Sequence, residues 1–236
     1  MQKLISIMRS AIDKYNMIEN GDKIAIGMSG GKDSLALLCA LAEMRRFYPH
    51  NYELVAITLD PCFDSEPSDF SQIEELCRRL NIQYIIKRTN LAHIIFEQRH
   101  EKNPCSLCAI MRRGALHDLA LEYGCNKIAF GHHMDDAAET FMMNLFNLGQ
   151  MSCFSPVSYL SRKDLYMIRP LVLASESQIT RVVNKIRLPV VKSRCPVDKN
   201  TQRETVKNLL TDLEKQYPAL RKKIIGGLQR GNIDNW

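Results

Sequence analysis

A short segment rich in glycine and charge offers the clearest chemistry in this sequence. Its members are Ser29, Gly30, Gly31, Lys32, Asp33 and Ser34. It follows an apolar run and opens a helical pattern, so backbone amides and the positive end of a helix dipole would face an anion. Lys32 adds positive charge, and Asp33 could hold a magnesium ion that bridges phosphates. The segment is not the longer G-x-x-x-x-G-K-[ST] loop, and the alternative is an ordinary glycine-rich turn.

A second polar segment has the same setting. The stretch 131–140 reads GHHMDDAAET and again stands between a strand-like run and a helical pattern. Its histidines, His132 and His133, could serve chemistry, or they could cap the helix or pack against it. A zinc site made of both is disfavoured, because adjacent side chains point apart.

Three of the eight cysteines are placed for metal or sulfur chemistry. Cys105 and Cys108 form a C-x-x-C pair at the start of a helical pattern, and Cys195 lies far along the chain. A helix N-terminus lowers the pKa of a thiol, which favours ligation or sulfur chemistry over packing. Two alternatives stay open: half of a zinc site that borrows a histidine, and a thioredoxin-type redox pair that leaves the third cysteine idle.

The other five cysteines are expected to be structural. Apolar or isolated settings make buried or spare thiols the simplest interpretation. They are Cys39, Cys62, Cys77, Cys125 and Cys153. A disulfide framework is not expected, since the N-terminus shows no export signal and the cytosol keeps thiols reduced.

Strand-length apolar runs alternate with amphipathic helices through the first 170 residues, the pattern of a doubly wound α/β sheet that is mainly parallel. The predicted strands are Lys23–Met28, Glu53–Leu59, Gln83–Lys87, Lys127–Gly131 and Leu165–Ile168. The predicted helices are Leu4–Met17, Lys32–Phe47, Asp69–Leu80, Ser106–Tyr123 and Asp135–Leu148. In such a sheet the ligands bind at the carboxyl ends of the strands, where both polar segments fall.

The remainder of the chain is predicted to be helical. Ile179, Val182, Val183 and Ile186 have helical spacing, and further helices are expected at Gln202–Lys215 and Ala219–Leu228. We therefore divide the chain into a nucleotide-binding α/β domain, 1–170, and a small helical extension, 171–236, that carries the third cysteine.

Charge and hydropathy limit the classes of partner. The net charge is +6, which favours a polyanionic partner without requiring one. Basic groups lie at residues 78–79, 87–88 and 221–223, and they suggest a phosphate-binding surface. The apolar runs are too short to span a membrane, so a cytoplasmic protein with no membrane partner is expected.

The first segment resembles the SGGxDS fingerprint of the PP-loop, or N-type, ATP pyrophosphatase superfamily. Members cleave ATP between the α and β phosphates and use AMP to activate an oxygen. The resemblance implies that Gly27, Met28 and Ser29 border the nucleotide and that the backbone of Ile57 contacts adenine. It further implies that Lys32 and Asp33 serve pyrophosphate and metal.

The second segment resembles GHHxDDxxET of the tRNA-modifying members of that superfamily. By this resemblance Gly131 permits the nucleotide to approach, His132 borders it, and Asp135 or Asp136 orients the metal or the adenylated oxygen.

Over nearly its whole length the chain resembles the tRNA 2-thiocytidine biosynthesis (TtcA) family. The resemblance lies in Pro104–Cys108, the Met-Arg-Arg-Gly stretch 111–114, Arg169-Pro170-Leu171, and a late cysteine followed by Gln202-Arg203. It implies a [4Fe–4S] cluster on Cys105, Cys108 and Cys195, with one iron open to carry sulfide. It also implies that Arg112 contacts a nucleotide phosphate and that Arg169 positions tRNA or phosphate.

The expected reaction is thiolation of a tRNA pyrimidine, with cytidine in the anticodon loop the first expectation. ATP with Mg²⁺ would adenylate the C2 oxygen, and sulfur from a sulfide or persulfide donor would replace it. Catalytic roles are assigned to Lys32, Asp33, Arg112 and Asp136, and the family suggests a homodimer. The rival functions are a lysidine-synthetase-like ligase, a sulfurtransferase for a small metabolite, and a nucleotide or cluster module without turnover.

Overall fold

A six-stranded sheet forms the centre of the protein, a computed structural model that describes residues 1–63, 66–98, 104–192, 194–195 and 202–236. The strands are β1 (Asp22–Met28), β2 (Tyr52–Asp60), β3 (Gln83–Arg88), β4 (Lys127–Ala129), β5 (Val157–Leu160) and β6 (Leu165–Ile168). Their order is β3-β2-β1-β4-β6-β5, and every neighbouring pair is parallel except β5 with β6. The order reverses between β1 and β4, which opens a crevice at their carboxyl ends.

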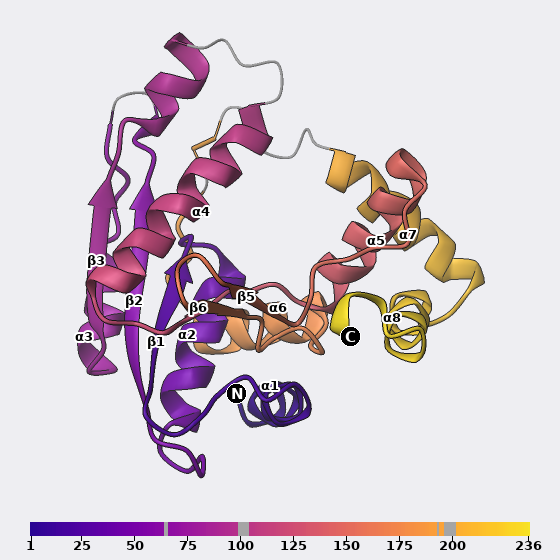
Figure 1. Cartoon of the computed structure of the whole chain (residues 1–236), viewed down its shortest axis with the longest axis horizontal. Helices are drawn as coiled ribbons and strands as arrows, with labels where there is room; N and C mark the ends of the chain where they lie inside the picture. The colour runs from indigo at the N-terminus through magenta and orange to yellow at the C-terminus, as the bar shows by residue number, and fades with distance from the viewer. Residues whose placement is uncertain (64–65, 99–103, 193, 196–201) are drawn as a thin grey trace.

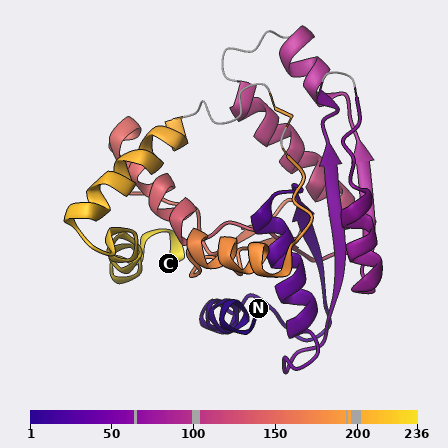
Figure 2. The same cartoon turned by 180° about the vertical axis from the view of Figure 1, so that it is seen from behind.

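Helices cover both faces of the sheet. They are α1 (Gln2–Lys14), α2 (Lys32–Met44), α3 (Ser71–Arg79), α4 (Pro104–Glu122), α5 (Met134–Leu148), α6 (Glu176–Ile186), α7 (Gln202–Gln216) and α8 (Leu220–Arg230). In Figure 1, α4 lies in front of the strands, and Figure 2 shows α1, α2 and α6 on the opposite side.

The alternation of side chains along β1 explains the two layers. Ile24 and Ile26 are buried in the core that contains α1, α2, α3 and α6, whereas Ala25 is buried in the core that contains α4. Successive residues of a strand point to opposite faces, so a strand that is apolar throughout must be covered on both. The buried central sheet therefore holds its carboxyl ends in fixed positions.

A helical unit stands beside the sheet. Figure 1 shows α5, α7 and α8 together on the right, and Val206 and Leu210 of α7 form a small core with Ala138 of α5. Within this unit α5 comes before residue 170 in the chain, and α7 and α8 come after it. Helix α6 also comes after residue 170, but it packs on α1 and α2 at the sheet. Helix α5 begins directly after β4, so one end of the unit is fixed at the sheet's carboxyl edge.

The expected α/β architecture is confirmed, with a few differences in its elements. All five predicted strands and all predicted helices are present with shifted ends. The edge strand β5 and a π-helix at His93–Gln98 were not predicted. No helix in the described part of the chain is long and apolar enough to cross a membrane.

Candidate functional site

The segment Ser29–Ser34 forms a tight loop between β1 and α2. Gly30 has a φ of +81°, in the left-handed region that favours glycine, and a Cβ there would lie 3.1 Å from Cβ of Val191. Ser29 Oγ accepts a hydrogen bond from the Gly31 amide at 3.2 Å, and Ser34 Oγ donates to Gly31 O at 3.0 Å. No side chain caps the start of α2. The first amides of the helix are thus directed at an incoming anion.

A pocket of about 310 Å³ opens beside this loop at the carboxyl ends of β1, β2 and β4. It is lined by Gly27, Met28, Ser29, Ile57, Leu59, Ala109, Arg112, Arg113, Leu116, Phe130 and His132. The wall is mainly apolar and contains two arginines and no carboxylate, a composition suited to an adenosine with phosphate attached. Four predicted nucleotide residues line it together: Gly27 and Met28 at the end of β1, Ser29 in the loop that follows, and Ile57 of β2.

Gly131 brings the second segment against the first. A Cβ at this position would lie 3.0 Å from the carbonyl carbon of Asp33 and 3.0 Å from the amide nitrogen of Ser34. Glycine is therefore required for the contact between the two backbones. This approach of the phosphate loop is one reason for glycine at position 131, and the predicted approach of the nucleotide to Gly131 stays a prediction.

The two adjacent histidines do different things. His133 is buried and caps α5, where its Nδ1 accepts from the Asp136 amide while Asp136 Oδ2 accepts from the His133 amide. His132 lines the pocket and packs against Phe130 and Phe154, with ring centroids 5.7 and 5.2 Å away. Burial lowers the pKa of His132 to about 4, so the ring is neutral at pH 7. His133 is thus the capping residue, and His132 belongs to the pocket.

The two aspartates of this segment face different neighbours. Asp136 stays close to His133, and its Oδ1 lies 3.7 Å from Arg203. Asp135 accepts from the Glu176 amide at 2.7 Å and lies 3.4 Å from Arg221 Nε. Asp135 therefore joins α5 to α6 and α8, and it is not among the residues that line the pocket. Its expected role as a nucleotide ligand receives no support from this geometry.

A chain of charges runs from the phosphate loop to α7. Lys32 Nζ lies 3.1 Å from Asp33 Oδ2 and 3.1 Å from Glu176 Oε1, and Lys207 Nζ lies 2.9 Å from Glu176 Oε2. Burial alone would raise the pKa of Glu176, but the hydrogen bonds from the two lysines outweigh it and lower the pKa to about 2. Glu176 and Lys207 were missed in the sequence, because their partners lie far away along the chain.

Two polar groups at the site have unused hydrogen-bonding capacity. Asp33 Oδ1 and Arg112 Nε are buried without a hydrogen-bond partner in the described structure. His133 Nε2 lies 3.7 Å from Asp33 Oδ1. Buried polar atoms of this kind are normally satisfied. Asp33 Oδ1 is available to bind Mg²⁺, and Arg112 Nε is available to donate to a phosphate. Both groups therefore suit a magnesium nucleotide, which is the ligand that the sequence predicts for these two residues.

The cysteine segments flank the same loop. Cys108 precedes Ala109, which lines the pocket, and Cys195 follows Val191 by four residues. The Val191 amide donates to Gly30 O at 3.0 Å. Cys108 and Cys195 are partly exposed. The third predicted ligand, Cys105, lies in α4, but its side chain is outside the described residues.

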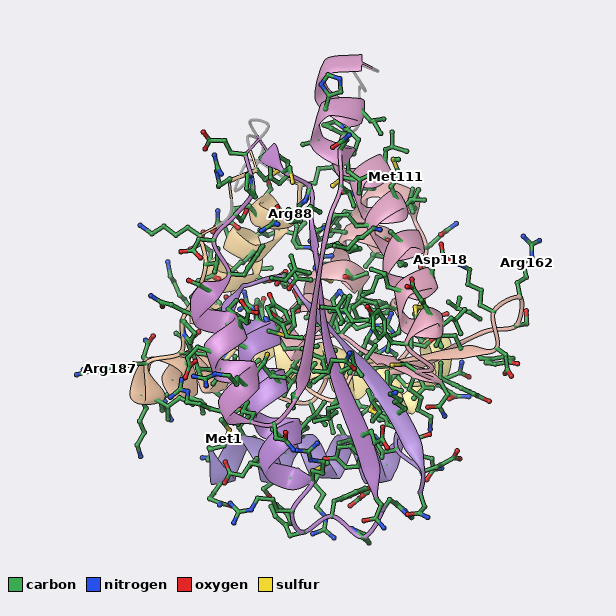
Figure 3. The ribbon with its side chains drawn as sticks, turned by 90° about the vertical axis from the view of Figure 1, so that its left-hand side faces the viewer. Met1, Arg88, Met111, Asp118, Arg162 and Arg187 are labelled. Atoms are coloured by element: carbon green, nitrogen blue, oxygen red, sulfur yellow. The ribbon has the colours of Figure 1, made fainter. Side chains whose placement is uncertain are left out.

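The predicted ligands Cys105, Cys108 and Cys195 have the side-chain type that an iron–sulfur cluster needs, because thiolates are the usual ligands of such clusters. In Figure 3, Met111 of α4 lies in the upper part of the molecule together with Arg88 at the end of β3, and Asp118 lies lower, so α4 begins near the carboxyl ends of the strands and runs away from them. Within the described part of the chain, which does not include the Cys105 side chain, no three histidine, cysteine or acidic side chains are grouped to hold a metal ion.

Three of the five cysteines that are predicted to be structural lie in the core, and the other two, Cys62 and Cys153, are partly exposed. Cys39, Cys77 and Cys125 are buried, and burial raises the pKa of their thiols to about 11, 12 and 11. Thiols of this kind stay protonated and pack as small apolar groups.

Comparison with known proteins identifies the family. The PP-loop domain family matches residues 4–214. A tRNA-cytidine(32) 2-sulfurtransferase of Geobacter sulfurreducens is 37% identical over 98% of this chain and 90% of its own length. A protein of the same name from Geotalea daltonii is 40% identical over 92% of this chain and 87% of its own length. The chain belongs to the PP-loop family of tRNA-cytidine(32) 2-sulfurtransferases.

Solved structures agree with membership of this PP-loop family. The U34-tRNA thiolase NcsA from Methanococcus maripaludis, solved with its [4Fe–4S] cluster, superimposes with a TM-score of 0.76 at 27% identity. The match covers 95% of this chain and 77% of NcsA. An NH3-dependent NAD synthetase from Campylobacter jejuni shares the fold, with a TM-score of 0.51 at 17% identity over 97% of this chain and 93% of its own. The predicted family, the α/β fold and the sulfurtransferase class are confirmed.

Proposed function

We propose that this chain uses ATP to replace the C2 oxygen of a tRNA cytidine with sulfur, as the name of its relatives describes. The observation that supports this proposal is that the nucleotide pocket and the segments of Cys108 and Cys195 all lie next to the phosphate loop Ser29–Ser34. The nucleotide pocket includes Ser29 and Ala109, next to Cys108, while Val191 joins the Cys195 segment to Gly30 by a hydrogen bond. An ATP site and two thiol-bearing segments therefore share one end of the sheet.

The residues of the site can perform the adenylation. The amides at the start of α2 and Lys32 bind the phosphates, and Arg112 stabilises charge on the α phosphate as the cytidine O2 attacks it and pyrophosphate leaves. Asp33, with Asp136 nearby, orients Mg²⁺. His132 is neutral and adds no positive charge. The apolar wall excludes water from the adenylated base until sulfur displaces AMP.

A [4Fe–4S] cluster held by Cys105, Cys108 and Cys195 supplies the sulfur when bound. A sulfide donor replenishes the sulfur directly, and a persulfide donor would do so together with a two-electron thiol reductant. The reaction takes place in the cytoplasm, and a homodimer is the proposed assembly. The base must leave its stack to reach the pocket, so a loop nucleotide is an easier target than a paired one.

The test is anaerobic purification with iron and sulfide analysis, followed by mass spectrometry of nucleosides from tRNA incubated with ATP and sulfide. We expect 2-thiocytidine with wild-type protein, and its loss in C108S and C195S with ATP binding retained. C62S, a substitution of another partly exposed cysteine, is the control and should retain activity. Product formation by C108S and C195S would instead favour a ligase that does not use the thiols. Pyrophosphate release without a modified tRNA would favour a small-metabolite substrate.

A further inference from the structure

The last two residues of the second polar segment are Glu139 and Thr140, and neither lines the nucleotide pocket. They lie on α5 one turn beyond Asp136, and Glu139 is only 3% exposed. A buried carboxylate is costly unless it is paired or hydrogen-bonded. Glu139 is paired with Arg203, the second residue of α7, so this end of the segment faces α7 and not the nucleotide.

The guanidinium of Arg203 contacts three residues of α5. Its Nη1 donates to the carbonyl oxygen of Asp136 at 3.3 Å and to Glu139 Oε2 at 3.4 Å, and its Nη2 donates to Thr140 Oγ1 at 3.1 Å. Nη1 also lies 3.7 Å from Asp136 Oδ1. The planar fork of an arginine can make these contacts together, whereas a lysine presents a single nitrogen. Arg203 therefore fixes the orientation of the first turns of α5 as well as their distance from α7.

The start of α5 faces the phosphate loop. Asp136 Oδ2 accepts from the His133 amide at 2.9 Å, and His133 Nε2 lies 3.7 Å from Asp33 Oδ1. Asp33 and Asp136 are the two carboxylates that the proposed reaction uses to orient Mg²⁺, an ion that requires nearly ideal octahedral geometry. A small rotation of this turn of α5 would move the carboxylate of Asp136 relative to Asp33. A contact that holds the turn therefore affects the metal, even from the side of α7.

We propose that Arg203 is a positioning residue of the adenylation site, which fixes Asp136 relative to Asp33 so that both carboxylates serve the magnesium ion of bound ATP. Arg203 is not among the residues that line the pocket, so it acts through Asp136 and not on the nucleotide. Glu139 and Thr140 hold its guanidinium in place. The inference rests on the proposed function, because it concerns the same magnesium nucleotide.

Two simpler roles of Arg203 lead to different expectations. If Arg203 only balanced negative charge, its removal would leave Asp136 more attractive to a cation, and Mg²⁺ would bind more tightly. If it only attached α7 to α5, any loss of packing between these helices would have the same effect. Leu210 of α7 is 1% exposed and packs in the small core with Ala138 of α5, so L210A weakens this attachment without changing Arg203.

The test compares R203M, R203K and L210A with wild-type holoenzyme. Calorimetric titration gives the dissociation constant for ATP with excess Mg²⁺ and again with EDTA, and the ratio of the constant in EDTA to that in Mg²⁺ isolates the contribution of the metal. We expect R203M to reduce this ratio about tenfold, with the constant in EDTA changed less than about twofold. R203K keeps the charge but not the fork, and it should reduce the ratio about threefold. L210A should lower the urea midpoint of unfolding and leave the ratio unchanged.

A double substitution shows whether Arg203 acts through its contacts with α5. T140V removes one acceptor of the guanidinium and should reduce the ratio less than R203M does. Because the two residues are in contact, T140V should cause no further loss in the R203M background. If R203M fails to fold, R203K and T140V give the same comparison.

An unchanged or higher ratio in R203M would overturn the proposal, as would an equal reduction in L210A. Full wild-type behaviour of R203K would assign Arg203 to charge balance alone and would overturn it as well. These outcomes concern Arg203 only, since wild type is the reference. Wild-type protein whose ATP affinity does not depend on Mg²⁺, or that releases no pyrophosphate with tRNA, would contradict the proposed function and, with it, this role of Arg203.

Discussion

At Gly131 the backbones of the two nucleotide segments come into close contact. Because its missing Cβ would lie 3.0 Å from backbone atoms of both Asp33 and Ser34, no side-chain rotation can relieve the clash. We expect G131A to displace the phosphate loop, weaken ATP binding at least tenfold and destabilise the fold by about 1–3 kcal/mol. Calorimetric titration with ATP and urea denaturation measure the two effects.

The control for this substitution is G114A. Gly114 lies in α4, and a Cβ there would meet nothing within 4 Å. Alanine is a better helix former than glycine by up to about 1 kcal/mol, so G114A should bind ATP normally and be slightly more stable. Equal ATP affinity in G131A and G114A would contradict the steric role of Gly131.

His132 gives the protein a pH dependence of known sign. Its pKa is about 4 in the folded protein and near the ordinary 6.5 when unfolded, because burial disfavours the charged ring. The unfolded state therefore binds more protons below pH 6.5, and the stability contributed by the neutral ring is lost as the pH falls from 6.5 toward 4. Between pH 7 and pH 5 this loss is about 2 kcal/mol.

The measurement is urea denaturation of wild type and H132N at both pH values. Wild type should lose about 2 kcal/mol more than H132N over this interval, whereas H50N, at an exposed histidine, should follow wild type. Parallel losses in wild type and H132N would mean that the ring is not desolvated.

At the scale of elements, Glu176 attaches α7 to the phosphate loop. It lies at the start of α6 and accepts from Lys32 and Lys207, two lysines on different helices. The E176Q variant keeps the shape of the side chain but removes the negative charge that pairs with Lys32 and Lys207. Because the ion pairs are partly exposed, we expect a destabilisation of only about 1 kcal/mol. Hydrogen exchange should be faster in residues 202–216.

D212N is the matched control for E176Q. Asp212 pairs with Lys215 on the outer face of α7, with both side chains more than two thirds exposed. Exposed pairs of this kind contribute little, so exchange in α7 should match wild type. If E176Q also leaves α7 exchange unchanged, the ion pair between Glu176 and Lys207 does not hold the helix in place.

The elements that the sequence could predict are those whose signal is local. In the predicted strand Lys23–Met28 every residue after Lys23 is apolar, and this run lies in the buried centre of the sheet. By contrast, β5 has four residues and none is fully buried, so it carries no strand pattern and forms by pairing with β6. The phosphate loop could be predicted because its residues are contiguous. Glu176 and Arg203 could not, because only the packing of distant helices brings them to the site.

At the scale of the whole molecule, the last residues of the chain support the pocket wall. Figure 1 shows both ends of the chain to the right of the lower part of the sheet, N at α1 and C beside α8. Trp236 is 5% exposed, and its Nε1 donates to Phe154 O at 2.8 Å. Its ring lies 6.2 Å from that of Phe154 and 6.4 Å from that of Tyr15 on the chain next to α1. The ring of Phe154 also packs against His132 and the guanidinium of Arg169. A continuous set of packed side chains therefore extends from α1 to the nucleotide site.

Substitution of Trp236 should therefore affect both stability and the site. We expect W236A to lower the free energy of unfolding by about 3 kcal/mol, because the indole fills a buried space and satisfies a carbonyl. W236F should lose less, since it keeps the ring contacts and lacks only the hydrogen bond. Y217A, at an aromatic residue that is 55% exposed, should stay within about 0.5 kcal/mol of wild type. Urea denaturation followed by circular dichroism measures all three, and wild-type stability in W236A would show that the Phe154 loop is held by Arg169 and Ser155 without help from the C-terminal residues.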